Sequence, residues 1–312
     1  MAREGRTTVP PGPFGTDPGR VPAVPVVLTP DGVEINYFDL GGSGPPVLMV
    51  HATGFHGHMW QPIADRLQDD FHCWALDLRG HGDSGPPPDL DFSWSGFAQD
   101  IRAVVDRLGL ERPRAVGHSL GGANSLFVEQ LAPGTFSSIY AYEPAIWVPV
   151  PEGVGDDGST AVDLALRRRA HFPSRQAALA NYAAKAPMDS FAPECLAAYV
   201  EHGFAEDGDG SVHLKCRPEY EAGAFRGFAG TTIYARLPEV RCPVVIARGS
   251  DPGSQAAERN EVFVSQLPHG RGEELAGLNH FGPQQSPTAL GDSIRTALGA
   301  ELTVERCGAS ER

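Results

Sequence analysis

The stretch Gly117–Gly121, with the sequence GHSLG, decides how the rest of the chain is interpreted. It has the pattern G-x-S-x-G and lies between a short apolar run and a stretch with a helical pattern that extends to Leu131. A sharp turn from a strand into a helix would hold Ser119 in a strained conformation with its hydroxyl exposed. The alternative is an ordinary helix N-cap after a glycine-rich turn. The five residues alone do not decide between the two.

Length and charge limit the classes of protein to be considered. The chain has 312 residues, of which 41% are hydrophobic, so a sizeable core in one large domain with an insertion, or in two domains, is expected. The formal net charge is -14, from 25 Lys and Arg against 39 Asp and Glu. Nucleic acids and anionic membranes attract clustered positive charge. We therefore expect neither as a partner and predict a small-molecule substrate, whereas the sequence does not indicate the oligomeric state.

The N-terminal region and the cysteines indicate the compartment. Residues 1–20 are rich in Pro and Gly and lack the apolar core of a signal peptide, and no run approaches the length of a membrane span. Five scattered cysteines without a CxxC pair are typical of reduced thiols. We therefore expect a cytoplasmic protein in which residues 1–24 form a flexible arm.

Strand and helix patterns alternate along most of the chain. A hairpin about Asp31-Gly32 is expected at residues 26–38. Apolar runs typical of buried strands lie at 46–50, 71–78, 114–117, 137–145 and 243–247, and a further strand is expected at 273–276. Helical periodicity follows at 60–67, 97–108, 122–131, 254–267 and from 286 onward. This alternation predicts an α/β fold with a mostly parallel central sheet and helices on both faces.

Residues 149–238 interrupt this alternation. They contain helical stretches at 161–170, 175–185 and 193–202 but no buried-strand run. We interpret the segment as an inserted helical cap over the strand ends, with residues 25–148 and 239–312 forming the core.

Three reactive residues follow predicted strands. In open α/β sheets the ligand site lies at the carboxyl ends of the strands, and Ser119, Asp251 and His280 all have this position. A serine hydroxyl becomes a nucleophile when a base accepts its proton, and histidine is the natural base at neutral pH. A carboxylate fixes the imidazole tautomer. Glu143, which follows the strand at 137–142, is the alternative acid.

Taken in order, four segments resemble the capped serine hydrolases of the α/β-hydrolase superfamily. They are the loop 51–55 (HATGF), the loop 77–85 (DLRGHGDSG), the nucleophile elbow at 117–121, and the loops that carry the acid and the base. The resemblance implies an oxyanion hole formed by the backbone N–H groups of Thr53 and Leu120. Ala52 stands where the family usually has glycine, so the path of that loop is not fixed by the resemblance.

Other residues have two readings. A group of aromatic residues is proposed to line an apolar substrate pocket, with core packing as the alternative: Phe55, Trp60, Tyr142, Trp147 and Phe281. The run Arg167–Arg169 is either a solvated helix face or an anchor for a substrate carboxylate. His51, His56 and His58 share one loop without the spacing of a third metal ligand. Glycine-rich stretches do not match a nucleotide-binding pattern. We therefore expect neither a metal nor a cofactor.

These features predict a serine esterase that cleaves a carboxylic ester or lactone through an acyl-enzyme, with a catalytic triad of Ser119, His280 and Asp251. The same fold and triad support C–C bond hydrolysis, thioester cleavage, cofactor-free perhydrolysis and lyase chemistry. A non-catalytic ligand receptor with this fold is an alternative of a different class.

Overall fold

The computed structural model describes residues 25–148 and 159–309, with side chains described up to Gly299. The expected flexible arm at 1–24 and the first ten residues of the expected cap therefore lie outside the described residues. Within the described part, no helix has the length and apolar character that a membrane crossing requires.

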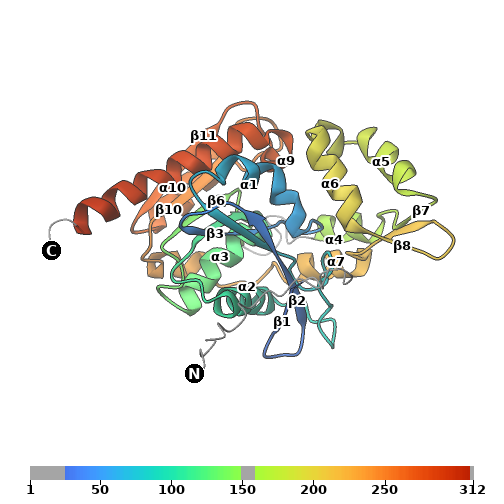
Figure 1. The fold of residues 1–312 in the computed structure, drawn as a ribbon, viewed down its shortest axis with the longest axis horizontal. Helices are drawn as coiled ribbons and strands as arrows, with labels where there is room; N and C mark the ends of the chain where they lie inside the picture. Colours follow the sequence, from blue (N-terminus) through green and yellow to red (C-terminus); the bar gives the residue numbers. More distant parts are fainter. Residues whose placement is uncertain (1–24, 149–158, 310–312) are drawn as a thin grey trace, which may run out of the picture.

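An eight-stranded sheet forms the centre of the described molecule (Figure 1). Its strands, in spatial order, are β1 (Val26–Leu28), β2 (Glu34–Gly41), β4 (His72–Leu76), β3 (Pro46–Val50), β5 (Arg114–His118), β6 (Ser138–Tyr142), β10 (Val244–Gly249) and β11 (Gly270–Leu275). The strands from β4 to β11 pair in parallel, whereas β1 and β2 pair antiparallel. The predicted hairpin and the mostly parallel sheet are both confirmed.

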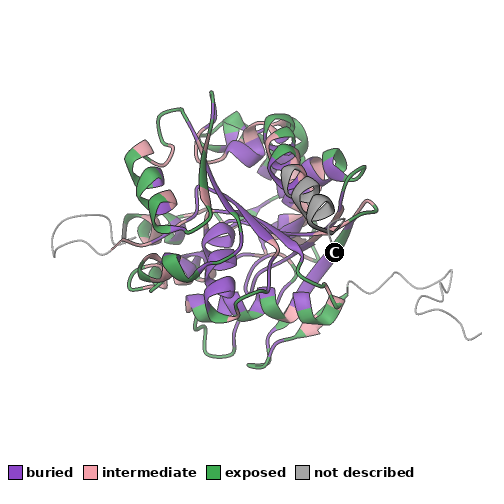
Figure 2. Cartoon of the chain, turned by 90° about the vertical axis from the view of Figure 1, so that its left-hand side faces the viewer, coloured by how far each residue is buried: buried purple, intermediate pink, exposed green. Residues whose placement is uncertain are grey.

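Helices cover both faces of the sheet because its central strands are apolar on both sides. In β3, Leu48 and Val50 belong to the cluster that includes residues of α2 (Trp94–Leu108), α3 (Leu120–Leu131) and α8 (Ala257–Gln266). Val47 and Met49 point to the opposite face, which is packed against α1 (Gln61–Leu67) and α10 (Pro287–Ala309). Figure 2 shows this as buried strands inside helices whose outer sides are exposed. A short helix, Gly57–Trp60, precedes α1.

The last strand is longer than predicted. The structure has β11 at Gly270–Leu275 and not at 273–276. This strand lies at the edge of the sheet, and along GRGEEL two of its six residues are half-buried, three are exposed and Leu275 alone is buried. An edge strand does not need apolar residues on both faces, so the hydrophobic pattern identifies only the last residues of β11.

The insertion comprises the described residues 159–239, of which residues 159–226 lie at one end of the molecule (Figure 1) and the last turn packs on α3 and α8. Its helices are α4 (Ser159–Leu166), α5 (Arg175–Ala183), α6 (Pro193–Gly203) and α7 (Pro218–Arg226), with short turns of helix at Met188–Ser190 and Tyr234–Glu239. It also contains a small antiparallel sheet, formed by β7 (His171–Phe172), β9 (Val212–Leu214) and β8 (Phe204–Glu206). These strands of two or three residues are too short for a sequence pattern to reveal.

Candidate active site

Ser119 lies at a tight turn between β5 and α3. Its backbone has φ 51° and ψ -113°, a conformation that residues with a side chain rarely adopt. Flanking glycines permit the turn, because a Cβ on Gly117 would lie 2.5 Å from the Gly122 Cα and one on Gly121 would lie 2.2 Å from the Val50 carbonyl oxygen. The Ser119 side chain makes no capping hydrogen bond to the described helix α3. The strained turn is therefore present, and the ordinary N-cap is not.

His280 reaches the same region from the loop between β11 and α9 (Gly282–Gln285). His118 Nε2 donates a hydrogen bond to the His280 carbonyl oxygen at 2.8 Å. The Tyr142 hydroxyl donates to the Asn279 carbonyl oxygen at 2.7 Å. Because His118 precedes Ser119 directly, the end of β5 holds both the serine and the loop that carries the histidine.

A buried carboxylate lies against His280. Glu143 Oε2 is 2.8 Å from His280 Nδ1, and the Glu143 side chain is 0% exposed whereas that of His280 is 34% exposed. The backbone N–H groups of Gly249 and Gln255 donate to Glu143 Oε1 and Oε2 at 2.9 Å and 3.0 Å. Glu143 itself has a positive φ of 42° directly after β6. The carboxylate therefore has partners at both oxygens.

Charge and hydrogen bonding keep this carboxylate ionised. Burial raises the pKa of Glu143, but the hydrogen bond and charge of His280, together with the two backbone amides, outweigh it and hold the pKa below its usual value. An ionised carboxylate can only accept, so His280 Nδ1 carries the proton and Nε2 is left as the basic nitrogen. A half-exposed imidazole in this tautomer is able to take a proton from a neighbouring hydroxyl.

The structure corrects the expectation that Asp251 orients His280. Asp251 does follow β10, but its side chain is exposed and its backbone N–H donates to the Leu278 carbonyl oxygen at 2.9 Å. The loop after β10 contacts Glu143 through its backbone amides, not through a carboxylate. Sequence pattern locates the loop at the strand end, whereas the direction of each side chain depends on the backbone path within the loop.

The loop 51–55 follows β3 directly and is braced from within the core. The Leu78 N–H donates to His51 Nε2 at 2.9 Å, and His51 Nδ1 donates to the Ala52 carbonyl oxygen at 2.8 Å. Burial, together with the nearby His81, lowers the pKa of His51 well below 6.5, so the ring is neutral and keeps one donor and one acceptor. The two hydrogen bonds of the His51 ring therefore fix the first two residues of the loop to the core.

This loop also contacts the start of α3. A Cβ on Gly121 would lie 2.6 Å from the His51 carbonyl oxygen, so the two segments meet in direct backbone contact. Thr53 is half-buried in the loop, and Leu120 is buried at the first position of the helix. The first backbone N–H groups of a helix have no partner within the helix and favour negative charge.

Two of the five proposed pocket residues form an aromatic contact that begins at His280. The ring of Phe281 is 5.3 Å from that of His280, and the ring of Phe55 is 6.1 Å from that of Phe281. Phe191 and Tyr199, both from the insertion, contact Phe55 as well. Sequence reasoning missed these two because nothing in the insertion's pattern indicates which of its aromatic residues faces the core.

The other three aromatic residues are placed differently. Trp60 and Tyr142 are fully buried in the hydrophobic cluster between the sheet and helices α1 and α10, so their prediction as pocket lining is corrected to core packing. Trp147 is half-buried after β6, and among the described residues its ring makes no aromatic contact with His280.

The described histidines of the loop after β3 do not form a metal site. Among the described residues no three His, Cys, Asp or Glu side chains are arranged to hold a metal ion. His51 is used in bracing its loop, and the ring of His58 is stacked on that of His202 in α6, with ring centroids 3.9 Å apart.

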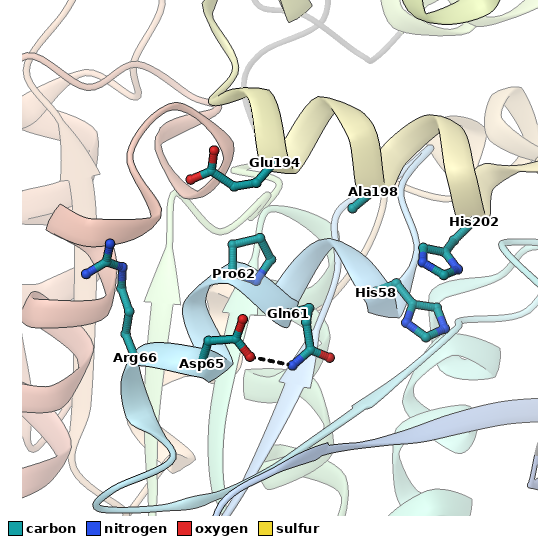
Figure 3. Close-up of a pocket in the computed structure, with 8 residues that line it drawn as sticks. All are labelled: His58, Gln61, Pro62, Asp65, Arg66, Glu194, Ala198 and His202. Carbon is teal, nitrogen blue, oxygen red and sulfur yellow. Dashed lines mark hydrogen bonds between the residues drawn. The ribbon is translucent and has the colours of Figure 1, made fainter. Parts of the chain in front are cut away.

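A surface groove of about 510 Å³ lies near these histidines, between α1 and α6 (Figure 3). It is lined by His58, Gln61, Pro62, Asp65, Arg66, Glu194, Ala198 and His202. Gln61 and Asp65 on its floor hydrogen-bond to each other at 2.7 Å. Neither Ser119 nor His280 lines this groove, so it is a seam between the core and the insertion and not the candidate active site.

The stacked histidines make this seam sensitive to acid. Burial and the charge of His202 lower the pKa of His58 to about 4, and burial lowers that of His202, while Lys215 and Asp83 act on both in opposite directions. A histidine with a lowered folded-state pKa stabilises the fold fully above its unfolded value near 6.5, and this contribution is lost as the pH falls toward 4. The core and the insertion are therefore expected to separate more readily in acid.

We expect the variant His202→Gln to lose less stability than the wild type between pH 6.5 and pH 4.5. Replacing His202 removes one of the histidines with a lowered pKa and removes its charge from beside His58, whereas the charge of Lys215 remains. Urea denaturation midpoints across this pH range measure the effect, and His269→Gln, at an exposed position, is the matched control. Equal pH dependence of His202→Gln and wild type would contradict the prediction.

Comparison with known proteins supports the assignment of the fold. A family model described as "Alpha/beta hydrolase family" matches residues 47–292. The crystal structure of E-2-(acetamidomethylene)succinate hydrolase superposes with a TM-score of 0.74 at 24% identity, and covers 88% of this chain and 98% of that one. At this identity the likeness demonstrates a shared fold.

Two curated relatives match parts of the chain. N-formylmaleamate deformylase of Pseudomonas putida is 33% identical over 108 residues, which are 34% of this chain and 40% of that protein. A type I acyl-CoA thioesterase of Penicillium brevicompactum is 29% identical over 174 residues, which are 51% of this chain and 40% of that protein. The chain thus spans well under half the length of these relatives.

Proposed function

Because the chain belongs to the alpha/beta hydrolase family, we propose that it is a serine hydrolase that cleaves a carboxylic ester or lactone through an acyl-enzyme on Ser119. The hydrogen bond of 2.8 Å between His280 Nδ1 and the fully buried Glu143 carboxylate carries this proposal. It gives the imidazole a fixed tautomer and an anionic partner in the same region as a strained serine, which is the arrangement that nucleophilic catalysis requires.

In the first half of the reaction, Ser119 Oγ attacks the acyl carbon while His280 Nε2 accepts the hydroxyl proton. The Glu143 carboxylate stabilises the imidazolium that forms. As the tetrahedral intermediate collapses, the bond from carbon to the leaving oxygen breaks. His280 gives its proton to that oxygen, and the alcohol leaves an acyl group on Ser119.

Water completes the reaction. His280 accepts a proton from a water molecule as that molecule attacks the acyl carbon, and the proton then returns to Ser119 Oγ as the carboxylic acid is released. In both halves the negative oxygen is expected to be held by the backbone N–H groups of Thr53 and Leu120. Contact between the loop 51–55 and the start of α3 supports this pairing, and one such donor contributes about 10²–10³ in rate.

The names of the relatives are compatible with acyl transfer to water. A thioesterase and a deformylase both release an acyl group from a heteroatom, so they support acyl-enzyme chemistry more than any particular leaving group. Because the alignments cover only 40% of each relative, their substrates are not carried over to this chain. We therefore keep the proposal at carboxylic esters and lactones.

Labelling with a fluorophosphonate probe tests the proposal on the intact protein. We expect a covalent adduct that mass spectrometry assigns to Ser119, together with turnover of p-nitrophenyl acetate and butyrate. Heat-denatured protein is the control for nonspecific reaction. Absence of both labelling and turnover would overturn the proposal and favour a ligand receptor.

A substrate panel then separates the chemistries available to this fold. Turnover of esters and lactones faster than that of acyl-CoA thioesters and of a vinylogous 1,5-diketone supports the proposal. Faster turnover of the thioester or the diketone would replace it with a thioesterase or a C–C bond hydrolase.

A further inference from the structure

An ion pair from the insertion lies against the loop that carries Thr53. Arg168 follows α4 and Glu221 lies in α7, with Arg168 Nη1 2.5 Å from Glu221 Oε2. A Cβ on Gly54 would lie 2.7 Å from Glu221 Oε1 and 3.0 Å from Arg168 Nη1. Gly54 has φ +80°, where glycine is favoured. The pair therefore packs directly on the loop backbone, one residue after Thr53.

Arg168 also joins this contact to α6. Its Nη2 donates a hydrogen bond to the Tyr199 hydroxyl, and the Tyr199 ring lies 5.8 Å from the Phe55 ring. Glu221 lies against Gly54 and Tyr199 lies against the next residue, Phe55. Both of these insertion residues bind the guanidinium of Arg168. The side chain of Arg168 is 19% exposed, and that of Glu221 is 10% exposed. The sequence reading of the Arg167–Arg169 run as a solvated face thus fails at Arg168.

Helix α7, which carries Glu221, is packed tightly against the core. Trp94 Nε1 donates to the Ala224 carbonyl oxygen at 3.1 Å. A Cβ on Gly223 would lie 2.5 Å from the Phe92 ring, and one on Gly227 would lie 2.6 Å from the Phe92 carbonyl oxygen. These close approaches leave α7 little room to shift. The loop 51–55 is therefore held by His51 from the core and by the ion pair from the insertion.

We propose that Arg168 and Glu221 are positioning residues that hold the Thr53 backbone N–H where the oxyanion forms, an inference that rests on the proposed function. The two side chains satisfy each other's charge, so they offer a substrate little net charge. They act through the backbone of Gly54. A misplacement of about 1 Å at a reacting centre can cost about 10²-fold in rate. Losing the pair therefore weakens transition-state stabilisation more than substrate binding.

The variant Arg168→Met keeps the length of the side chain and removes the ion pair. On p-nitrophenyl butyrate, a neutral ester, we expect kcat to fall about 10- to 100-fold with KM within about threefold. Inhibition by an alkyl boronic acid, whose tetrahedral adduct on serine has an oxygen in the oxyanion position, should weaken by a similar factor. Arg167→Met, at an exposed neighbouring position, is the matched control and should retain wild-type values.

Further variants keep the inference testable if Arg168→Met does not fold. Arg168→Lys retains a charge next to Glu221 and should recover part of the lost kcat. The double variant Arg168→Met/Glu221→Gln should be no slower than Arg168→Met by more than about threefold, because residues that act as a unit are not additive. Thermal denaturation of each variant identifies those that are folded.

The outcomes separate this inference from the proposed function. A wild-type protein that the fluorophosphonate does not label would refute the proposed function itself. Labelled wild type with unchanged kcat and boronate affinity in folded Arg168→Met and Arg168→Lys would overturn the inference alone. A rise in KM confined to anionic esters, with kcat unchanged, would also overturn it and assign Arg168 to substrate binding.

Discussion

Replacing Ser119 by alanine is expected to lower kcat for p-nitrophenyl esters by about 10⁴-fold or more and to abolish fluorophosphonate labelling. The hydroxyl is the proposed attacking group, so without it only a water molecule in the site can react. Steady-state kinetics on purified protein measures the residual rate.

Stability should change little in the same variant. Ser119 is half-buried, and its side chain makes no capping hydrogen bond to the described part of α3, so alanine removes no structural partner. Equal denaturation midpoints for Ser119→Ala and wild type would show that lost activity is chemical. A folded Ser119→Ala protein with more than about a tenth of the wild-type kcat would refute the acyl-enzyme proposal.

Glu143→Gln is expected to lower kcat by about 10³–10⁴-fold. The neutral amide cannot stabilise an imidazolium, and its NH₂ group can donate to His280 Nδ1, which favours the unproductive tautomer. Kinetics at pH values from 6 to 9 measure the loss. A stability loss of about 1–3 kcal/mol should accompany it, because one of the two backbone amides now bound to the carboxylate meets an NH₂ group.

Asp251→Asn provides the contrasting result. Its carboxylate is exposed, so we expect kcat within about threefold of wild type and an unchanged denaturation midpoint. A large loss of kcat in Asp251→Asn, with Glu143→Gln active, would restore the assignment that the sequence favours. A large loss of kcat in both variants would indicate that the Asp251 side chain also contributes to catalysis, in addition to the backbone amides that bind Glu143.

The fold was largely predictable because its signals are local. Buried strands such as β3 and β5 are apolar on both faces, and Gly109, the C-cap of α2, has a left-handed φ of 62°. The edge strand β11 and the two- and three-residue strands of the insertion were not predictable to the same extent. Their residues need not be apolar on two faces, so periodicity carries little information there.

Part of the candidate site was also predictable. A Cβ at either glycine that flanks Ser119 would lie only 2.2 to 2.5 Å from backbone atoms. The turn therefore requires the two glycines of the G-x-S-x-G pattern. His280 follows a strand end as expected and lies in the region of Ser119. Phe281 lies beside it and contacts Phe55, whereas Trp60 and Tyr142 are core residues. A large aromatic side chain looks the same in sequence whether it packs in the core or beside a site.

The sequence by itself thus determined the sheet, the strained serine and the order of reactive residues along the chain, because each depends on neighbours within a few positions. Only the tertiary structure decided which carboxylate faces His280 and which cap arginine is half-buried in an ion pair. Glu143 and Asp251 both follow strands that pair with each other. Which of them points inward depends on backbone turns and on amides from distant loops. Arg168 differs from exposed Arg167 only through its partners Glu221 and Tyr199, which lie far away along the chain.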